Sequence, residues 1–161
     1  MKAKLIVQAG VIAGLYVVLT IVSNSLGLAS GVIQLRLSEA LTILPWFTWS
    51  AVPGVFLGCL LANLLTGAVW IDVLVGSLTS LVAAWLTYRL RHKPIGLAPI
   101  PPIVLNALII PFVLRYAYGI PGSVIYFMVT IGLGQMASAG VLGMFLGLSL
   151  KARSQIFNNK A

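Results

Sequence analysis

Long runs of apolar residues, separated by prolines, glycines and short charged patches, make up most of this 161-residue chain. A helix that crosses a bilayer needs about 20 mostly apolar residues, so the chain has room for about six crossings and little else. The runs predict helices over about Leu5 to Ser23, Ser38 to Trp49, Pro53 to Leu65, Ile71 to Leu90, the end of the Arg91–Pro102 loop to Tyr116, and Ser123 to Leu150. We therefore expect an all-α, polytopic membrane protein with six transmembrane helices, in which residues 1–161 form one integral membrane domain.

Two of these boundaries depend on local features. The stretch Ser50-Ala51-Val52-Pro53-Gly54 divides the apolar run over 40–65, because proline disfavours helical backbone at the residue before it. At the start of the chain, Lys2 and Lys4 are similar to the basic start of a signal peptide. The apolar run that follows is longer than the roughly 7–15 residues of a secretory signal, so we expect a retained first helix.

The composition excludes a soluble protein. Hydrophobic residues make up 60% of the chain and charged residues only 7%, with a mean hydropathy of +1.09. A soluble domain carries roughly a quarter charged residues. The one cysteine, Cys59, lies inside an apolar run, so no disulfide can form within the chain and we interpret it as a small packed side chain.

The charged residues predict an orientation in the membrane. Ten Lys and Arg oppose two acidic residues, and they are scattered, which favours a topological explanation over nucleic-acid binding. Eight of the ten flank predicted helix ends on one side of a six-helix protein: Lys2, Lys4, Arg89, Arg91, Lys93, Lys151, Arg153 and Lys160. By the positive-inside rule, this side and both termini are cytoplasmic.

The other four charged residues predict a pocket on the opposite side. In this topology Arg36, Glu39, Asp72 and Arg115 all fall toward the outer surface. Ionisable groups at membrane depth are costly and mostly face a cavity or one another. Polar and aromatic residues at similar or greater depth accompany them: Gln34, Asn63, Trp70, Tyr116, Tyr118, Tyr126, Asn106 and Gln135.

Each of these residues also has a purely structural explanation. Glu39 and Asp72 stand in the first turns of predicted helices, where the helix dipole favours an acidic side chain. Arg115 with its neighbouring tyrosines is typical of an anchor at the membrane interface. Asn106 and Gln135 suit hydrogen bonds between helices. A pocket that opens outward explains their shared location together.

No set of residues predicts catalysis. The only histidine, His92, belongs to a short basic run, and no nucleophile with a base partner and no acid pair at catalytic spacing is present in the sequence. None of the five lysines follows a glycine, as a phosphate-binding loop requires. We expect no enzymatic activity and no metal or cofactor, so uphill transport requires an ion gradient or the ATPase of a partner.

The first predicted helix carries a stripe of small residues. Ala9 and Ala13 are four residues apart and are interleaved with Gly10 and Gly14. Small residues at this spacing let another helix approach closely. The stripe predicts a partner-helix interface, with packing inside the chain as the alternative.

The stretch Gly31-Val32-Ile33-Gln34-Leu35-Arg36-Leu37-Ser38-Glu39-Ala40-Leu41-Thr42-Ile43-Leu44-Pro45 resembles the signature of the QueT family. Members of this family are the queuosine-precursor S components, the substrate-binding subunits, of energy-coupling factor (ECF) transporters. The six-helix layout and the small-residue stripe are similar to theirs as well. The resemblance implies a bacterial multi-pass cell-membrane protein that captures a scarce nutrient outside, with the loop between its first two helices as a lid. It also implies a transmembrane coupling subunit and two cytoplasmic ATPases, which drive toppling in the membrane and release inside.

The implied ligand is queuine or another 7-deazaguanine, whose ring edge offers an N–H and an exocyclic amine beside a carbonyl. We expect the Glu39 carboxylate to accept both N–H groups in a bidentate pair. Amides are expected at the carbonyl and the five-membered ring, aromatic rings above the plane, and Asp72 or Glu39 at any cationic amine. The predicted substrate-binding residues are Glu39, Arg36, Gln34, Asn63, Trp70, Asp72, Asn106, Tyr126 and Trp46.

Two other functions remain open at this stage. The same composition suits an S component for another planar nutrient, such as a flavin, a pterin or a thiamine-like molecule. A membrane assembly subunit would use the outer charges to contact a partner, and it would bind no small molecule.

Overall fold

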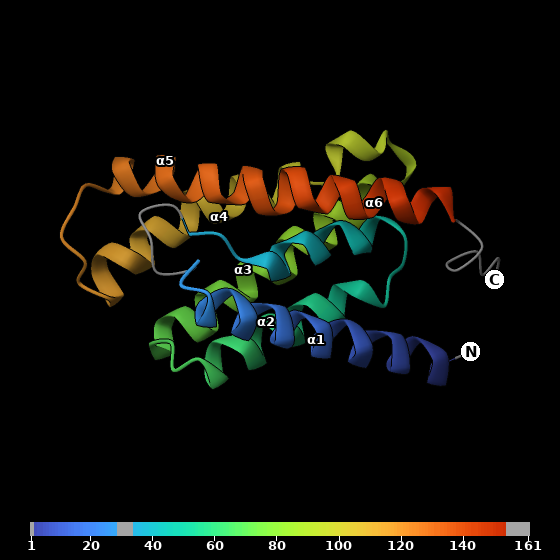
Figure 1. Ribbon diagram of the computed structural model, residues 1–161, viewed down its shortest axis with the longest axis horizontal. Coiled ribbons are helices and arrows are strands. Elements are labelled where there is room, and N and C mark those ends of the chain that lie inside the picture. The colour runs from blue at the N-terminus through green and yellow to red at the C-terminus, as the bar shows by residue number, and fades with distance from the viewer. Residues whose placement is uncertain (1, 29–33, 154–161) are drawn as a thin grey trace.

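The computed structural model describes residues 2–28 and 34–153, and every regular element in these ranges is helical (Figure 1). Short 3₁₀ or π-helical segments, labelled η, connect or extend the α-helices. In chain order the elements are α1 (Lys2–Ser25), η1 (Leu37–Trp46), α2 (Ala51–Leu65), α3 (Trp70–Arg89), η2 (Leu90–His92), η3 (Ile95–Leu97), α4 (Ile100–Phe112), η4 (Val113–Ala117), α5 (Val124–Gln135), η5 (Met136–Leu142) and α6 (Gly143–Ala152). The predicted all-α fold is therefore confirmed.

Each predicted apolar run corresponds to a helical segment. The predicted division of the apolar run over 40–65 into two helices is confirmed, since η1 ends at Trp46 and α2 begins at Ala51. The break lies at residues 47–50, earlier than expected, because Pro53 is in the first turn of α2, where proline is tolerated. The last predicted helix is continuous from Val124 to Ala152 but changes its winding in the middle, where η5 is a π-helix. Residues 31–33 of the signature stretch and Lys160 lie outside the described residues.

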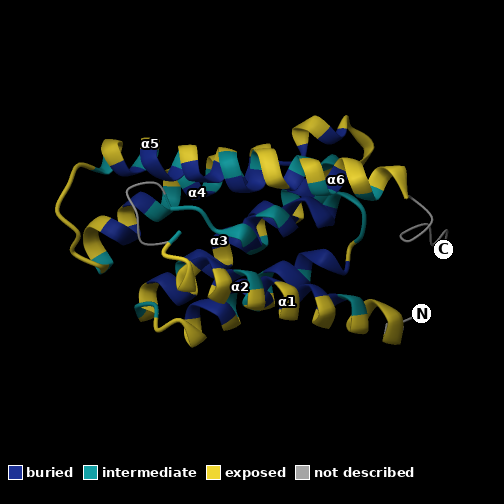
Figure 2. Ribbon diagram, in the orientation of Figure 1, coloured by how far each residue is buried: buried dark blue, intermediate teal, exposed yellow. Residues whose placement is uncertain are grey.

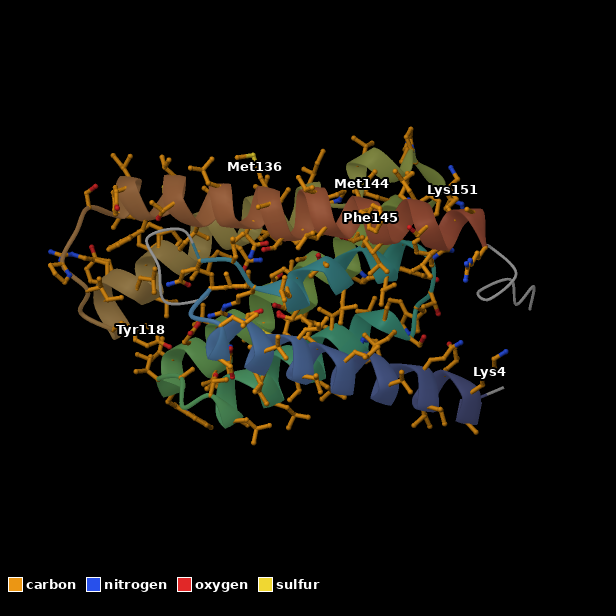
Figure 3. All side chains as sticks on the ribbon, viewed as in Figure 1. Lys4, Tyr118, Met136, Met144, Phe145 and Lys151 are labelled. Atoms are coloured by element: carbon orange, nitrogen blue, oxygen red, sulfur yellow. The ribbon has the colours of Figure 1, made fainter. Side chains whose placement is uncertain are left out.

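Four of the helical segments are long and apolar enough to cross a membrane: Ala3–Ser25, Trp70–His92, Ile95–Ala117 and Val124–Ala152. The 15 residues of α2 extend only about 22 Å and the 10 residues of η1 about 20 Å, against a hydrocarbon core of about 30 Å. Six complete crossings therefore remain a prediction. α1 begins and α6 ends at the same end of the molecule, where Lys4 and Lys151 lie, and Tyr118 lies at the opposite end (Figures 1 and 3). That the first of these ends faces the cytoplasm remains a prediction too.

The outer faces of the helices are apolar, whereas the interior is partly polar. Large hydrophobic side chains such as Ile6, Ile125 and Phe145 are exposed, while Ser23, Ser77 and Thr87 are buried. Figure 2 shows the exposed residues along the outward faces of the helices. This distribution is typical of a protein surrounded by lipid. Burying an apolar face between helices gives no hydrophobic stabilisation there, whereas polar groups find hydrogen-bond partners between helices.

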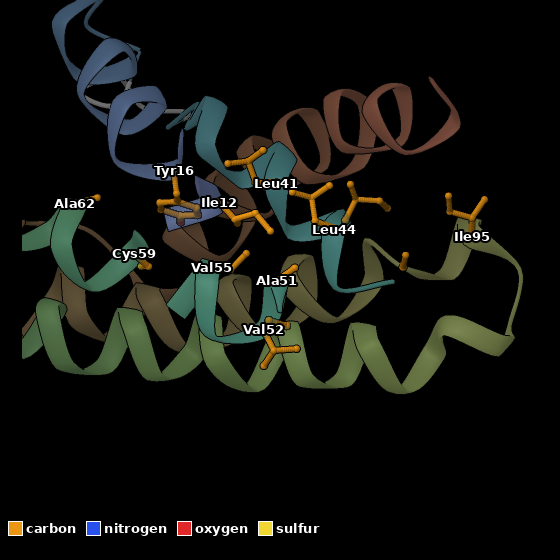
Figure 4. Close-up of a cluster of buried hydrophobic side chains, with 13 residues drawn as sticks. Ile12, Tyr16, Leu41, Leu44, Ala51, Val52, Val55, Cys59, Ala62 and Ile95 are labelled. Atoms are coloured by element: carbon orange, nitrogen blue, oxygen red, sulfur yellow. The ribbon is translucent and has the colours of Figure 1, made fainter. Parts of the chain in front are cut away.

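One apolar cluster joins α1, η1, α2, α3 and the connection that leads to α4 (Figure 4). Its buried members are Ile12, Tyr16, Leu41, Ile43, Leu44, Ala51, Val52, Val55, Cys59, Ala62, Ala84, Ile95 and Ala98. Cys59 is 3% exposed, as its interpretation as a small packed side chain requires. The cluster fixes η1 in the middle of the molecule, in contact with α1, α2, α3, η5 and α6.

The small-residue stripe of α1 divides between two faces. A Cβ atom added to Gly54 of α2 would lie 3.0 Å from the Ala9 carbonyl oxygen, and one added to Gly58 would lie 3.1 Å from the Cα of Ala13. Ala9 and Ala13 therefore pack inside the chain, and the prediction that they contact a partner helix is corrected. Gly10 and Gly14 are exposed, with nothing within 4 Å of a Cβ built at either position. Only these two glycines remain available to a partner.

The winding of η1 is the feature of the fold that the sequence did not predict. It is a 3₁₀ helix of 10 residues, whereas such helices rarely exceed three or four. A 3₁₀ helix has three residues per turn, so residues three apart share a face. Arg36, at the N-terminal cap of η1, and Glu39 in its first turn thus lie on one side, where they line the same pocket.

Candidate functional site

Two neighbouring chambers, which share part of their lining, lie among the buried polar residues. The inner chamber is lined by Gln34, Arg36, Glu39, Cys59, Asp72, Gly76, Ser80, Asn106, Ile110, Ile131 and Gln135. The outer chamber is lined by Thr20, Asn24, Gln34, Arg36, Asn63, Thr66, Gly67, Ala68, Asp72, Ile110, Leu114, Tyr118 and Ile120. Gln34, Arg36, Asp72 and Ile110 belong to both walls, so they form the junction between the chambers.

The two chambers differ in size. The outer chamber has a cavity volume of about 240 Å³, whereas that of the inner chamber is about 30 Å³, room for one or two water molecules. A planar bicyclic ring thus fits the inner chamber only when a side chain at the junction moves. Gln34 and Arg36, which belong to both walls, lie in the short non-helical segment before η1.

Three hydrogen bonds fix the start of η1 to α1. The Tyr16 hydroxyl donates to Glu39 Oε1 over 2.6 Å, and the Thr20 hydroxyl donates to the Ser38 hydroxyl over 2.8 Å. The Leu37 amide donates to the Ser23 hydroxyl over 2.9 Å. Tyr16, Thr20 and Ser23 are spaced at one helical turn along α1, so one stripe of that helix holds successive residues of η1. This stripe sets the position of the Glu39 carboxyl group.

Glu39 retains one oxygen without a partner. Its side chain is 3% exposed, and among the described residues Oε2 has no hydrogen-bond partner. Gln135, which is 8% exposed, has an equally unpartnered carbonyl oxygen, Oε1. Buried polar atoms are almost always hydrogen-bonded, because leaving one unpaired costs roughly 1–3 kcal/mol. Two unpaired acceptors in the wall of one chamber are therefore available for hydrogen bonds from water or from the N–H or O–H groups of a ligand.

Asp72 stands at the junction and contacts a residue from the far side of the outer chamber. The Tyr118 hydroxyl donates to Asp72 Oδ2 over 2.8 Å. Burial and this bond to the carboxylate raise the pKa of Tyr118 from 10.0 to about 12, so the hydroxyl stays protonated and keeps donating at neutral pH. A Cβ added to Gly76 would lie 3.0 Å from Asp72 Oδ1 and 3.2 Å from Asn63 Nδ2, so a larger residue here would crowd both polar groups.

The segment before η1 is pressed closely against α5. A Cβ atom added to Gly134 would collide with the backbone carbonyl oxygen of Gln34. The Leu35 amide also donates to the Leu28 carbonyl oxygen over 2.9 Å. The absence of a side chain at Gly134 is thus what allows this segment to close over the junction and bring Gln34 into both chambers.

The two predicted amides serve different parts of the site. Asn63 lines the outer chamber and donates to the Asp72 backbone carbonyl over 3.4 Å, which braces the first turn of α3. Asn106 lines the inner chamber, and its amide nitrogen donates to the Pro102 carbonyl oxygen over 2.9 Å. This bond leaves the Asn106 carbonyl oxygen as the part of the side chain that can meet a ligand.

Six predicted substrate-binding residues thus line the chambers: Gln34, Arg36, Glu39, Asn63, Asp72 and Asn106. The three predicted stacking residues do not. Trp46 lies at the other end of η1, where its ring nitrogen donates to the Lys93 carbonyl oxygen. Trp70 is 66% exposed and Tyr126 is 48% exposed, as expected for aromatic rings at a membrane interface.

Arg115 is also outside the site. It is exposed, and its guanidinium donates to the Ile120 carbonyl oxygen over 3.4 Å. Its grouping with the pocket charges is corrected, because membrane depth alone does not determine which way a side chain points.

Several lining or supporting residues were absent from the predicted set, and four of them show why. Gln135 had a usable signal, since it is a lone amide in an apolar run. Tyr16 in α1 and Ser80 in α3 resemble ordinary helix residues in the sequence, as does Cys59 in α2. Their role follows only from the packing that brings them beside η1.

Comparisons with known proteins identify the family to which the chain belongs. A family model described as QueT transporter matches residues 6–152. The chain is 38% identical over 77 residues to a protein of Lactococcus lactis subsp. cremoris (strain MG1363) named queuosine precursor transporter QueT. That stretch is 48% of this chain and 45% of the relative, so the match spans about half of each protein. No solved structure matches the chain. The family match extends over nearly all of the described helices, and this multi-pass membrane protein therefore belongs to the QueT transporter family.

Proposed function

We propose that the chain is the substrate-binding S component of an ECF-type importer for queuosine precursors, and that the two chambers are its substrate site. The observation that carries the proposal is the buried Glu39 carboxylate, in the wall of a chamber shared with Arg36 and Asp72, whose Oε2 has no partner in residues 2–28 and 34–153. A buried charge is retained in a membrane protein where it binds a substrate or pairs with another charge. Membership of the QueT transporter family directs this site toward a 7-deazaguanine.

The chemistry of the walls supports such a ligand. A 7-deazaguanine offers two N–H donors and a carbonyl on one edge, and the inner chamber offers carboxylate and amide acceptors beside the Arg36 guanidinium. Hydrogen bonds to a charged partner are roughly twice as strong as neutral ones. The ring then lies across the junction with its polar edge toward Glu39, and the outer chamber takes the substituent on the five-membered ring.

The import cycle needs partners that this chain does not supply. Within the proposal, a transmembrane coupling subunit contacts the exposed face of α1 that carries Gly10 and Gly14. Two cytoplasmic ATPases then drive the toppling that releases substrate into a bacterial cell. The absence of a phosphate-binding loop from the sequence fits this division of labour.

Calorimetric titration of the purified chain in detergent tests the proposal. The ligands are queuine and its aminomethyl and cyano precursors, with riboflavin and thiamine as controls. Tight binding of deazaguanines alone is the expected result. Binding of riboflavin or thiamine instead would reassign the nutrient. If the folded protein binds none of these ligands, the result would favour an assembly subunit.

A further inference from the structure

The structure changes the expected role of Glu39. A bidentate pair with the ligand needs both carboxylate oxygens, but Oε1 already accepts a 2.6 Å hydrogen bond from the Tyr16 hydroxyl. Tyr16 is 1% exposed and is fixed in the apolar cluster, so this bond holds Oε1 toward α1. Within the part of the chain that the structure describes, Oε2 is the carboxylate oxygen left without a partner, and it can meet a ligand in the inner chamber.

A second acceptor lies beside it. Gln135 ends α5, directly before the π-helical segment η5, and it lines the inner chamber with Glu39. Its amide is next to the Glu39 carboxyl group, although no hydrogen bond of normal geometry reaches Glu39 Oε2. Gln135 Oε1 is buried and also unpartnered. The chamber wall therefore offers two neighbouring acceptors from two different elements.

We infer that Gln135 is a specificity-determining residue: Glu39 Oε2 accepts one N–H of the ligand, and Gln135 Oε1 accepts a second N–H on the same ring edge. This inference rests on the proposed function and adds the chemistry that the site selects. The matching edge carries a ring N–H and an adjacent exocyclic amine, as in a 2-amino-4-oxopyrimidine. Tyr16 is the positioning residue that leaves Glu39 only one oxygen to offer.

The inference separates ligand classes that the composition of the site does not. A flavin presents a ring N–H between two carbonyls, so it would set a carbonyl oxygen against one of the two acceptors. A 2-deamino analogue of the deazaguanine would leave Gln135 Oε1 buried and unpaired, and an unpaired buried group weakens binding strongly. Both are therefore rejected in favour of the 2-amino edge.

The test compares 7-deazaguanine with 7-deazahypoxanthine, which lacks only the 2-amino group, by calorimetry on the full chain in detergent. We expect the wild type to bind 7-deazaguanine about 10- to 100-fold more tightly. Gln135→Leu should lose most of this preference by weakening 7-deazaguanine binding, with little change for 7-deazahypoxanthine. Gln8→Leu is the matched control, because Gln8 bonds Ser50 outside the chambers and should leave the ratio unchanged.

The outcomes separate the inference from the proposed function. Equal binding of the two ligands by the wild type would overturn the role of Gln135 and leave a deazaguanine site in place. An unchanged ratio in Gln135→Leu would overturn it as well. If the chain binds neither 7-deazaguanine nor any of its ring-substituted relatives, both the proposed function and the inference are contradicted. If Gln135→Leu does not fold, Gln135→Met and the ligand pair on the wild type decide the question.

Discussion

The two ends of η1 are equally buried but differ in how their atoms are satisfied. At its C-terminal end, Ile43 is 1% exposed and packs in the main apolar cluster. At its N-terminal end, Glu39 is 3% exposed, and one of its carboxylate oxygens has no partner among the residues that the structure describes. Burial is therefore the same in a part that stabilises the fold and in a part that we assign to substrate. What distinguishes them is the unpaired polar atom, since buried polar groups without a partner are rare in structural positions.

The comparison also explains why one short element serves both purposes. The apolar cluster holds η1 from Leu41 to Leu44, and the Glu39 side chain is not one of its members. The hydrogen bonds from Tyr16, Thr20 and Ser23 of α1 then position the polar end. Substitutions at the two ends should consequently separate ligand binding from stability.

The largest effect is expected from Glu39→Gln. It removes the charged acceptor, and it brings an NH2 group to a position that must accept an N–H from the ligand, so affinity for 7-deazaguanines should fall about 100-fold or more. Calorimetric titration measures the loss, and a thermal melt shows whether the variant is folded. Lys151→Gln removes a charge at the opposite end of the molecule and should bind normally. Unchanged affinity in Glu39→Gln would remove this residue from the site.

The other end of η1 should respond in the opposite way. Ile43→Ala leaves a cavity in the apolar cluster and should lower the free energy of unfolding by roughly 2 kcal/mol or more. The affinity of the folded protein should change by less than about threefold, because Ile43 lines neither chamber. Denaturation in detergent and titration measure the two quantities. Ile125→Ala is the control, since that side chain is 74% exposed and should cost little. A large loss of affinity at Ile43 with stability unchanged would break the comparison.

A smaller effect is expected from Tyr16→Phe. This variant keeps the ring in the cluster but removes the 2.6 Å hydrogen bond that holds Glu39 Oε1. Affinity for 7-deazaguanine should fall roughly 10-fold, because the carboxylate loses a charge-assisted bond and its fixed position. Tyr88→Phe is the matched control, as the Tyr88 ring packs on Trp49 away from the chambers. If Tyr16→Phe and Tyr88→Phe bind 7-deazaguanine with equal affinity, Tyr16 does not position Glu39.

The smallest effect concerns the outer chamber and depends on pH. The pKa of Tyr118 is raised to about 12, so the folded protein holds this proton more tightly than the unfolded chain. Stability from the Tyr118–Asp72 bond is therefore complete below about pH 10 and decreases as the pH rises toward about 12. The stability difference between wild type and Tyr118→Phe should shrink accordingly in thermal melts at pH 8 and at about pH 11. A constant difference would mean that this bond adds no stability.

The sequence predicts the charged part of this site well. Arg36, Glu39 and Asp72 are isolated charges in apolar surroundings, and the cost of burying a charge makes such residues informative without any structure. The structure places all three in the walls of the inner chamber. The apolar runs predict the helical segments for the same reason, because lipid requires continuous apolar length.

The aromatic residues and the winding of η1 were beyond this reasoning. The position of Trp70 or Tyr126 along a helix does not determine whether the ring faces lipid or a chamber, and both rings are exposed. Nothing in the composition of Leu37–Trp46 distinguishes a 3₁₀ helix from an α-helix, yet this winding aligns Arg36 with Glu39. The contribution of Tyr16 depends on contact across 23 residues of sequence, which a local pattern does not encode.

A structure of the full chain with bound 7-deazaguanine tests the central claim most directly. We predict density for the planar ring across the junction of the two chambers, with its 2-amino edge on Glu39 Oε2 and Gln135 and its five-membered ring toward Asp72. A ring bound elsewhere, with Glu39 Oε2 still unpaired, would contradict the assignment of the chambers as the substrate site.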